Sequence, residues 1–224
     1  MSTRSHDAPT DVLQRLARVD TTSLVDAAAG AVRVLPAAIR PVRRGLRMVG
    51  RALTADTGED LMSVLGALRQ AGPGDVLVVS AGGEHAVLGE LFATESLRRG
   101  VTGVVIDGLC RDSRTLAELD LPVYARGVAP SAYPARGVPN VGVPIAIDGV
   151  EVRPGDVVLG DDDGVVVAGE EEVLAVLDAA EAIQRREEAL RAAITSGASL
   201  FDSLNYDEHV AAVRDGGASK LEFL

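Results

Sequence analysis

The feature that most restricts the fold is a short, continuous apolar run, DVLVVS at residues 75–80. A run of this length without polar alternation is typical of a strand buried on both faces of a parallel sheet. Apolar spacing predicts helices at Glu59–Gln70 before it and at Glu90–Arg99 after it, and Val101–Ile106 then resumes as a strand. Alternating strands and helices predict an α/β fold.

Other apolar patterns extend this reading. They predict helices at Asp11–Val19, from Ser23 onward and at Ser113–Leu119, and strands at Met48–Ala55, Val157–Leu159 and Val165–Val167. Between residues 141 and 147 apolar residues alternate, so the second half is expected to be rich in sheet. An Ala-rich helix is expected from Glu170 to about Thr195, followed by a polar tail. Because no linker or charge block divides the chain, we expect one domain over residues 1–224.

Charge and cysteine content exclude several classes of protein. Lys and Arg number 22 against 33 Asp and Glu, a net charge of −11, which argues against a nucleic-acid partner. The one cysteine, Cys110, permits neither an intrachain disulfide nor a multi-cysteine zinc site. Without a leader-like apolar stretch or a run of about 20 apolar residues, we expect no membrane partner and a cytoplasmic location.

A Gly-rich loop, Ala81–Gly89, follows the buried strand and precedes a helix. At such a place backbone N–H groups and the helix N-terminus attract an anion. The loop has neither a Walker motif nor G-x-G-x-x-G, so a small carboxylate suits it better than a nucleotide; a simple connection is the alternative. His85 in this loop is either a ligand contact or a solvated residue, and His6 and His209 are too distant in sequence to suggest a metal cluster.

Arg111 and Asp112 come shortly after the strand expected at Val101–Ile106, where α/β sheets place their ligands. Asp112 is a hard oxygen donor suited to Mg²⁺, and Arg111 offers a planar fork of donors for a carboxylate or an enolate. The alternative is that Asp112 is the N-cap of the following helix and Arg111 a surface charge. A second acidic motif, Asp161-Asp162-Asp163-Gly164, lacks the alternating ligands of a calcium loop, and we expect a tight turn there.

Together these motifs resemble a known family. Twenty residues separate Glu90 from Arg111-Asp112, the Gly-rich loop comes before them, and LDLPVY at residues 119–124 follows. This arrangement is similar to that of the RraA-like family, which includes divalent-metal aldolases acting on 4-hydroxy-4-methyl-2-oxoglutarate or 4-carboxy-4-hydroxy-2-oxoadipate, and regulators of ribonuclease activity. The similarity runs from about Thr22 to Gly164.

The resemblance implies a fold and an assembly. The expected fold is a compact α/β domain of sheet layers and flanking helices, of the swivelling β/β/α kind, with its core at about residues 22–168. The C-terminal helix, at about residues 170–196, is expected to pack on a neighbouring subunit of a homotrimer or homohexamer. In the family that helix supplies a Glu to the neighbour's site, and Glu187 or Glu188 is the candidate here.

The resemblance also implies a chemistry. Asp112 would hold Mg²⁺ or Mn²⁺ directly and Glu90 through water, whereas the aldolases usually have Asp at the position of Glu90. Arg111 would stabilise an enolate while Glu90 and water move the proton. Backbone N–H groups around Leu88, Gly89 and Leu91 would bind the pyruvyl carboxylate. The implied reaction is C–C cleavage of a 2-oxo acid with release of pyruvate, accompanied by possible decarboxylation of oxaloacetate.

Two alternatives remain open: a non-catalytic regulator that binds a ribonuclease, and a lyase or isomerase acting on a different oxo acid in a biosynthetic pathway. A Schiff-base aldolase is disfavoured, because the only lysine, Lys220, lies in the polar tail. The second half of the substrate has candidate contacts in Arg126, Ser131 and Tyr133.

Overall fold

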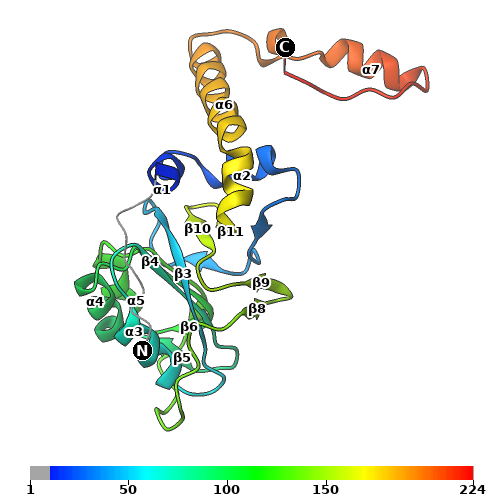
Figure 1. The fold of residues 1–224 in the computed structure, drawn as a ribbon. Helices are drawn as coiled ribbons and strands as arrows, with labels where there is room; N and C mark the ends of the chain where they lie inside the picture. The colour runs from blue at the N-terminus through cyan, green and yellow to red at the C-terminus, as the bar shows by residue number, and fades with distance from the viewer. Residues whose placement is uncertain (1–10, 224) are drawn as a thin grey trace. The chain divides into compact units, whose positions relative to one another are not determined.

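A computed structural model describes residues 11–223. It has a mixed α/β fold in which helices flank a nine-stranded sheet, as predicted (Figure 1). The chain divides into two compact units, Met1–Ala180 and Glu181–Leu224, and the boundary falls within one long helix. His6 lies outside the described residues. The expectation of a single domain over the whole chain stays a prediction.

Parallel strands form the centre of the sheet, and antiparallel strands lie at both sides. The order is β1-β11-β10-β3-β4-β6-β7-β2, with β5 paired to β6 outside this path. The strands are β1 (Arg33–Val34), β2 (Arg40–Pro41), β3 (Met48–Asp56), β4 (Asp75–Ser80), β5 (Ala86–Leu88), β6 (Gly103–Cys110), β7 (Val123–Val128), β10 (Val157–Gly160) and β11 (Val165–Ala168). Strands β3, β4, β6 and β7 run parallel to one another, and β5 runs parallel to β6.

Side chains of the central strands alternate between two hydrophobic layers, because successive residues of a strand point to opposite faces. Leu77 and Val79 of β4 pack in the layer that contains helices α3 (Met62–Gln70), α4 (Glu90–Arg98) and α5 (Ser113–Glu118). Val76 and Val78 pack in the other layer, with residues of the hairpin β8 (Ile145–Ile147) and β9 (Val150–Val152). Burial on both faces therefore explains why the 75–80 run has no polar alternation.

A third hydrophobic cluster joins the N-terminal helices to the end of the first unit. It combines α1 (Asp11–Leu16), α2 (Thr21–Ala28), strands β10 and β11, and the first half of α6 (Glu170–Thr195). Val173, Leu177 and Ala180 of α6 are buried there, at the spacing of one helix face. The predicted bounds of this long helix are confirmed.

Three expectations were wrong in detail. The Gly-rich loop contains a short buried strand, β5, because Ala86–Leu88 add to the edge of β6. Strand β6 does not stop at Ile106 but continues to Cys110, with a register irregularity between Ile106 and Leu109. The polar tail, for which no helix was predicted, forms a 3₁₀ turn, η1 (Leu200–Ser203), and helix α7 (Tyr206–Arg214).

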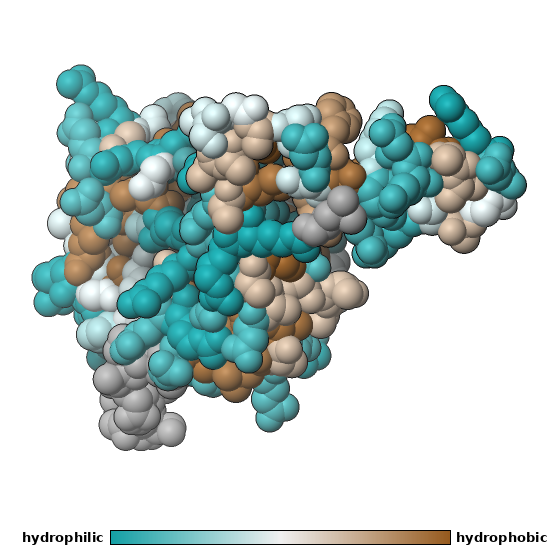
Figure 2. Space-filling model, turned by 90° about the horizontal axis from the view of Figure 1, so that it is seen from above, coloured by the Kyte–Doolittle hydropathy of each residue, from teal (hydrophilic) through white to brown (hydrophobic). Residues whose placement is uncertain are grey.

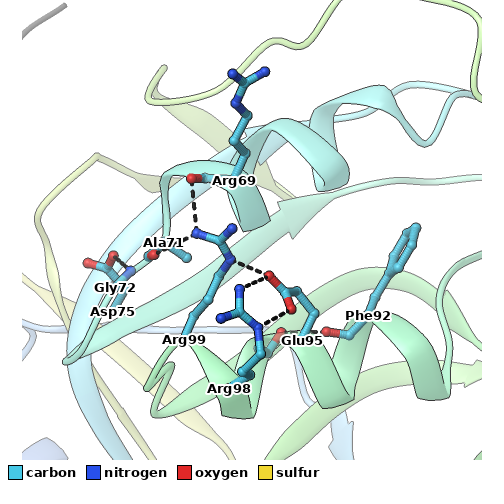
Figure 3. Close-up of polar contacts among 9 residues, drawn as sticks. Arg69, Ala71, Gly72, Asp75, Phe92, Glu95, Arg98 and Arg99 are labelled. Atoms are coloured by element: carbon cyan, nitrogen blue, oxygen red, sulfur yellow. Dashed lines mark hydrogen bonds and ion pairs between the residues drawn. The ribbon is translucent and has the colours of Figure 1, made fainter.

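The C-terminal end of α4 is fastened to that of α3 by a charged cluster (Figure 3). Glu95 accepts hydrogen bonds from Arg98 at 2.7 Å and from Arg99 at 2.6 Å, and these two guanidinium groups lower the pKa of Glu95 to about 2. Arg99 also donates to the carbonyl oxygens of Arg69 at 3.1 Å and Ala71 at 3.5 Å. These bonds hold in place the helix whose first residue is Glu90.

The acidic motif at residues 161–164 is the predicted tight turn between β10 and β11. The buried carboxylate of Asp161 accepts hydrogen bonds from the backbone N–H and the hydroxyl of Thr21, at 2.8 and 2.7 Å. The Tyr124 hydroxyl donates to the Asp161 carbonyl at 2.9 Å, and burial raises the pKa of Tyr124. Asp161 therefore ties the start of α2 to the sheet.

Among residues 11–223, the helices lack the combination of length and apolar character that crossing a bilayer requires. Hydrophobic side chains lie between hydrophilic ones on the face drawn in Figure 2.

Candidate functional site

Strand pairing brings Glu90 close to Arg111 and Asp112, although twenty residues separate them in the chain. Strand β5 lies parallel to the end of β6, with Leu88 opposite Cys110, so the segments that follow these two strands leave the sheet at the same edge. The Arg111 N–H donates to the Leu88 carbonyl at 2.9 Å, which extends this pairing by one more bond. The first turn of α4 therefore begins beside Arg111 and Asp112.

Gly89 is the point of closest approach. A Cβ atom at this position would lie 2.4 Å from Asp112 Oδ2 and 3.0 Å from both Cγ and Nε of Arg111. The backbone angles of Gly89, φ −138° and ψ −168°, are open to any residue, so space rather than conformation requires the glycine. Two polar side chains thus rest directly on the backbone at the start of α4.

Asp112 occupies the N-cap position of α5, but among the described residues its side chain makes no capping bond to that helix. Its Oδ2 instead accepts the N–H of Glu90 at 3.0 Å and so caps the neighbouring helix α4. The backbone of Asp112 is left-handed, with φ 56° and ψ 37°, a conformation that costs on the order of 1 kcal/mol outside glycine. The interpretation of Asp112 as the N-cap of α5 is therefore wrong for its side chain. In this backbone conformation the carboxylate points toward α4 instead.

Arg111 borders a small hollow of about 50 Å³, here called the Arg111 hollow. Its Nε lies 3.6 Å from Asp112 Oδ2, and its side chain is 43% exposed, so the guanidinium has solvent on one side. The Arg111 hollow is lined by Leu61, Ala86, Val87, Leu88, Gly89, Leu91, Phe92, Arg111 and Ala132.

The start of α4 gives the Arg111 hollow the chemistry of an anion site. The first N–H groups of a helix have no acceptor within the helix, and the macrodipole favours a negative charge there. Asp112 takes the N–H of Glu90, while Leu91 and Phe92 of the same turn line the hollow. The Leu88 side chain is buried, so only its backbone is suited to bind a ligand, whereas Leu91 is 72% exposed.

The oxygen donors here suit a hydrated hard cation. Within residues 11–223, no three His, Cys, Asp or Glu side chains gather closely enough to enclose a metal ion. Mg²⁺ is usually held by one or two carboxylates and keeps several waters, so it does not need such an enclosure. The Asp112 side chain is 36% exposed, Glu90 is exposed, and the bond to Glu90 N–H uses one of the two Asp112 oxygens. These residues fit Mg²⁺ or Mn²⁺ in a mostly aqueous shell.

The structure places the other predicted residues elsewhere. Glu187 and Glu188 are exposed on α6 within the second unit, and their role in a neighbour's site stays a prediction. His209 of α7 pairs with Ser219 at 3.1 Å. Lys220 is exposed in the tail.

A second, larger hollow adjoins the first. It measures about 450 Å³, is here called the His85 hollow, and is lined by Glu59, Gly83, Glu84, His85, Ala132, Tyr133 and Pro134. Ala132 borders both hollows. His85 Nδ1 lies 2.6 Å from Ser131 Oγ, and the His85 ring meets the Tyr133 ring edge to face at 4.9 Å. The backbone in this region is joined by the Ala86 N–H, which donates to the Ser131 carbonyl at 2.8 Å.

Sequence reasoning named Ser131 and Tyr133 as candidate substrate contacts but missed Glu59 and Glu84. Of the two named residues, Tyr133 lines the His85 hollow. Ser131 does not line it but contacts the ring of His85, which does. The third candidate, Arg126, is paired with Asp107 and, at 2.7 Å, with Asp148. Arg126 is therefore committed to an ion-pair network.

The fold and the site define an α/β protein with a polar corner at the carboxyl edge of a parallel sheet, where a helix N-terminus meets an Arg-Asp pair. The chain belongs to the RraA-like family, whose model, described as Aldolase/RraA, matches residues 21–167. A protein of Halalkalibacterium halodurans named "Putative 4-hydroxy-4-methyl-2-oxoglutarate aldolase" is 35% identical over 191 residues, covering 84% of this chain and 90% of that protein. A Burkholderia multivorans protein of the same name is 37% identical over 155 residues, 66% of this chain and 94% of its own.

Solved structures share the fold, and one of them is named as an RNA-processing inhibitor. A protein from Pseudomonas syringae pv. tomato superposes with a TM-score of 0.76 at 30% identity, covering 85% of this chain and 95% of its own. The RNA-processing inhibitor RraA from Thermus thermophilis superposes with a TM-score of 0.64 at 33% identity, over 68% of this chain and 94% of its own. The family relationship inferred from the sequence is confirmed.

Proposed function

We propose that this protein is a divalent-metal-dependent carbon–carbon lyase that cleaves a 4-hydroxy-2-oxo acid and releases pyruvate. The observation that carries the proposal is the convergence of Arg111 and Asp112 on the backbone of Gly89 at the N-terminus of α4. The names of the Halalkalibacterium and Burkholderia relatives support this class of reaction.

The pyruvyl end of the substrate would bind in the Arg111 hollow. Its carboxylate would accept hydrogen bonds from backbone N–H groups around Leu88, Gly89 and Leu91, where β5 leads into the N-terminus of α4 and the helix dipole favours negative charge. The Arg111 guanidinium would donate to the 2-keto oxygen. Because this oxygen gains charge as the bond breaks, a preorganised donor contributes on the order of 3 kcal/mol to the transition state.

Asp112 would hold Mg²⁺ or Mn²⁺ directly, and Glu90 would hold it through an intervening water. When bound, the cation supplies Lewis acidity toward the keto and carboxylate oxygens of a 2-oxo acid. The hydrogen bond from the Glu90 N–H and the contact with Gly89 keep the Asp112 carboxylate in position.

The bond changes are those of a retro-aldol reaction. The 4-hydroxyl loses its proton, the C3–C4 bond breaks, C4 becomes a carbonyl, and the electron pair passes to the pyruvate enolate. Glu90, exposed at the first residue of α4, would accept the 4-hydroxyl proton through water and return a proton to C3 by the same route. Decarboxylation of oxaloacetate passes through the same enolate, with CO₂ as the leaving fragment, and is an expected side activity.

Pyruvate release coupled to lactate dehydrogenase tests the proposal. We expect turnover of at least one 4-hydroxy-2-oxo acid or of oxaloacetate with added Mg²⁺ or Mn²⁺, and loss of turnover with a chelator. A panel that includes 4-hydroxy-4-methyl-2-oxoglutarate and releases no pyruvate with either metal would refute the lyase.

We propose assembly as a homotrimer or homohexamer in which Glu187 or Glu188 completes a neighbour's site. The exposure of both carboxylates on α6 is consistent with such a role. Light scattering gives the mass of the assembly. If the site is shared between subunits, mixing the inactive Arg111→Ala variant with an inactive Glu187→Gln, Glu188→Gln variant should restore activity.

A second candidate is the regulator branch, supported by the similarity to the Thermus inhibitor and by the net charge of −11, which suits a basic partner. Capture and inhibition of a ribonuclease by a protein that releases no pyruvate would favour this function over the lyase.

A further inference from the structure

Resting on the proposed lyase function, we infer that the His85 hollow receives the distal half of the substrate and selects a 2-oxo acid whose far end is neutral and hydroxylated. The two hollows share Ala132, and residues 85–89 run continuously from one lining to the other. A substrate held by its pyruvyl end at Arg111 therefore has its remaining carbons directed past Ala132 toward His85.

The charge of the His85 hollow argues against a second carboxylate on the substrate. Glu59 and Glu84 bring two negative charges to its lining, and His85 is its one basic side chain among the described residues. The chain as a whole carries a net charge of −11. A dianionic substrate would place its distal carboxylate beside these two carboxylates, and the like charges repel.

The polar groups of the hollow suit hydroxyls. A hydroxyl both donates and accepts, so it can donate to Glu59 or Glu84 and accept a hydrogen bond from the His85 ring. Ser131 Oγ, 2.6 Å from His85 Nδ1, fixes the orientation of that ring. Tyr133, which is 7% exposed, packs against this ring in an edge-to-face arrangement.

Gly83 keeps this arrangement compact. A Cβ on Gly83 would lie 1.8 Å from the Tyr133 hydroxyl oxygen, and the residue has φ +70°, so only glycine fits both the space and the backbone. The Gly-rich loop is thereby packed on Tyr133, with Glu84 and His85 next to it in the chain.

A matched pair of substrates tests the inference. The compounds 4,5,6-trihydroxy-2-oxohexanoate and 4,5-dihydroxy-2-oxohexanedioate differ only in having a hydroxymethyl group or a carboxylate at C6. Each exposed charge changes an equilibrium by up to about fivefold, so we expect the neutral-ended acid to have a kcat/KM about tenfold higher. The Glu59→Gln, Glu84→Gln double variant should lower this preference to about unity, whereas Glu171→Gln on α6, outside both hollows, should keep it.

Binding gives a readout independent of turnover. Calorimetry with 5-hydroxy-2-oxopentanoate and 2-oxoglutarate, which lack the 4-hydroxyl and cannot undergo retro-aldol cleavage, should show tighter binding of the former, and the Glu59→Gln, Glu84→Gln double variant should remove the difference. Pyruvate release from dianionic acids at equal or higher efficiency, with no change in the double variant, would overturn the inference and leave the lyase intact. Absence of pyruvate release from every acid would instead overturn the lyase itself.

Discussion

Replacing Gly89 by Ala is the sharpest perturbation of the proposed site. The added Cβ would lie 2.4 Å from Asp112 Oδ2, whereas ordinary contact begins near 3.4 Å, so the carboxylate must move by about 1 Å. Arg111, 3.0 Å away at two atoms, must also shift. A misplacement of about 1 Å costs about 10²-fold in rate, so we expect kcat to fall by about that factor.

The same change should leave the fold intact. Alanine adopts the extended backbone of Gly89 without strain, and the atoms it meets belong to partly exposed side chains. Losing the bond from Glu90 N–H to Asp112 costs about 1 kcal/mol, a decrease of about 2–4 °C in Tm. Gly127→Ala is the matched control, because its Cβ would meet only the tip of Leu109 at 3.3 Å. Wild-type kcat in Gly89→Ala, measured alongside Tm by circular dichroism, would refute the proposed geometry.

Three further changes test other parts of the account. Arg111→Ala should lower kcat by about 10²–10³-fold while Tm stays within about 2 °C, because the side chain is partly exposed; steady-state kinetics and circular dichroism measure both. The Asp60 carboxylate accepts backbone hydrogen bonds, above all from Met62, that hold its pKa below the ordinary value. Its stabilising effect is therefore present above the ordinary Asp pKa and is lost as pH falls through the lowered one. Wild type should accordingly be more stable than Asp60→Asn near neutral pH, and the two should converge in acid; a constant difference in urea midpoint at all pH values would contradict this. Asp161→Ala removes both acceptors of Thr21 from a buried position and should lower the free energy of unfolding by about 3 kcal/mol in urea titrations, while a loss below about 0.5 kcal/mol would show that α2 is held by other contacts.

The parts of the fold that follow from local apolar pattern were predictable. The run at residues 75–80 forms a strand with the predicted bounds, and Glu170–Thr195 forms the predicted helix, because burial of whole faces leaves a periodic trace in the sequence. Strand β5 left no such trace. Three residues, Ala86–Leu88, are too few to show a period among glycines, and their pairing partners in β6, Leu109 and Cys110, lie more than twenty positions away.

The candidate site was predictable in its residues but not in its contacts. The spacing of Glu90, Arg111 and Asp112 identified the members, whereas the left-handed backbone of Asp112 and its bond to α4 arise from tertiary pairing of β5 with β6. For the same reason, the sequence indicated His85 and Tyr133 as possible ligand contacts but not the hollow that they share with Glu59 and Glu84. The residues that line this hollow come from three separate segments of the chain, and nothing in their local sequence indicates that Glu59 and His85 line the same hollow.

Helix α7 was missed because it has no apolar face directed to a core. Within the described part of the chain, none of its side chains is buried, so the usual stripe of apolar residues is weak. Exposed Phe201, Tyr206 and Phe223 show that this segment instead keeps its larger apolar groups in contact with solvent.

Calorimetric titration with Mn²⁺, with and without pyruvate, is the most direct test of whether Asp112 binds a divalent cation in addition to capping helix α4. Wild type should bind one Mn²⁺ per chain, more tightly when pyruvate is present, and Asp112→Asn should weaken binding by at least about tenfold. Asp162→Asn, a change of the same charge in the turn between β10 and β11, should bind Mn²⁺ as wild type does. Equal Mn²⁺ affinity in wild type and Asp112→Asn would contradict the account.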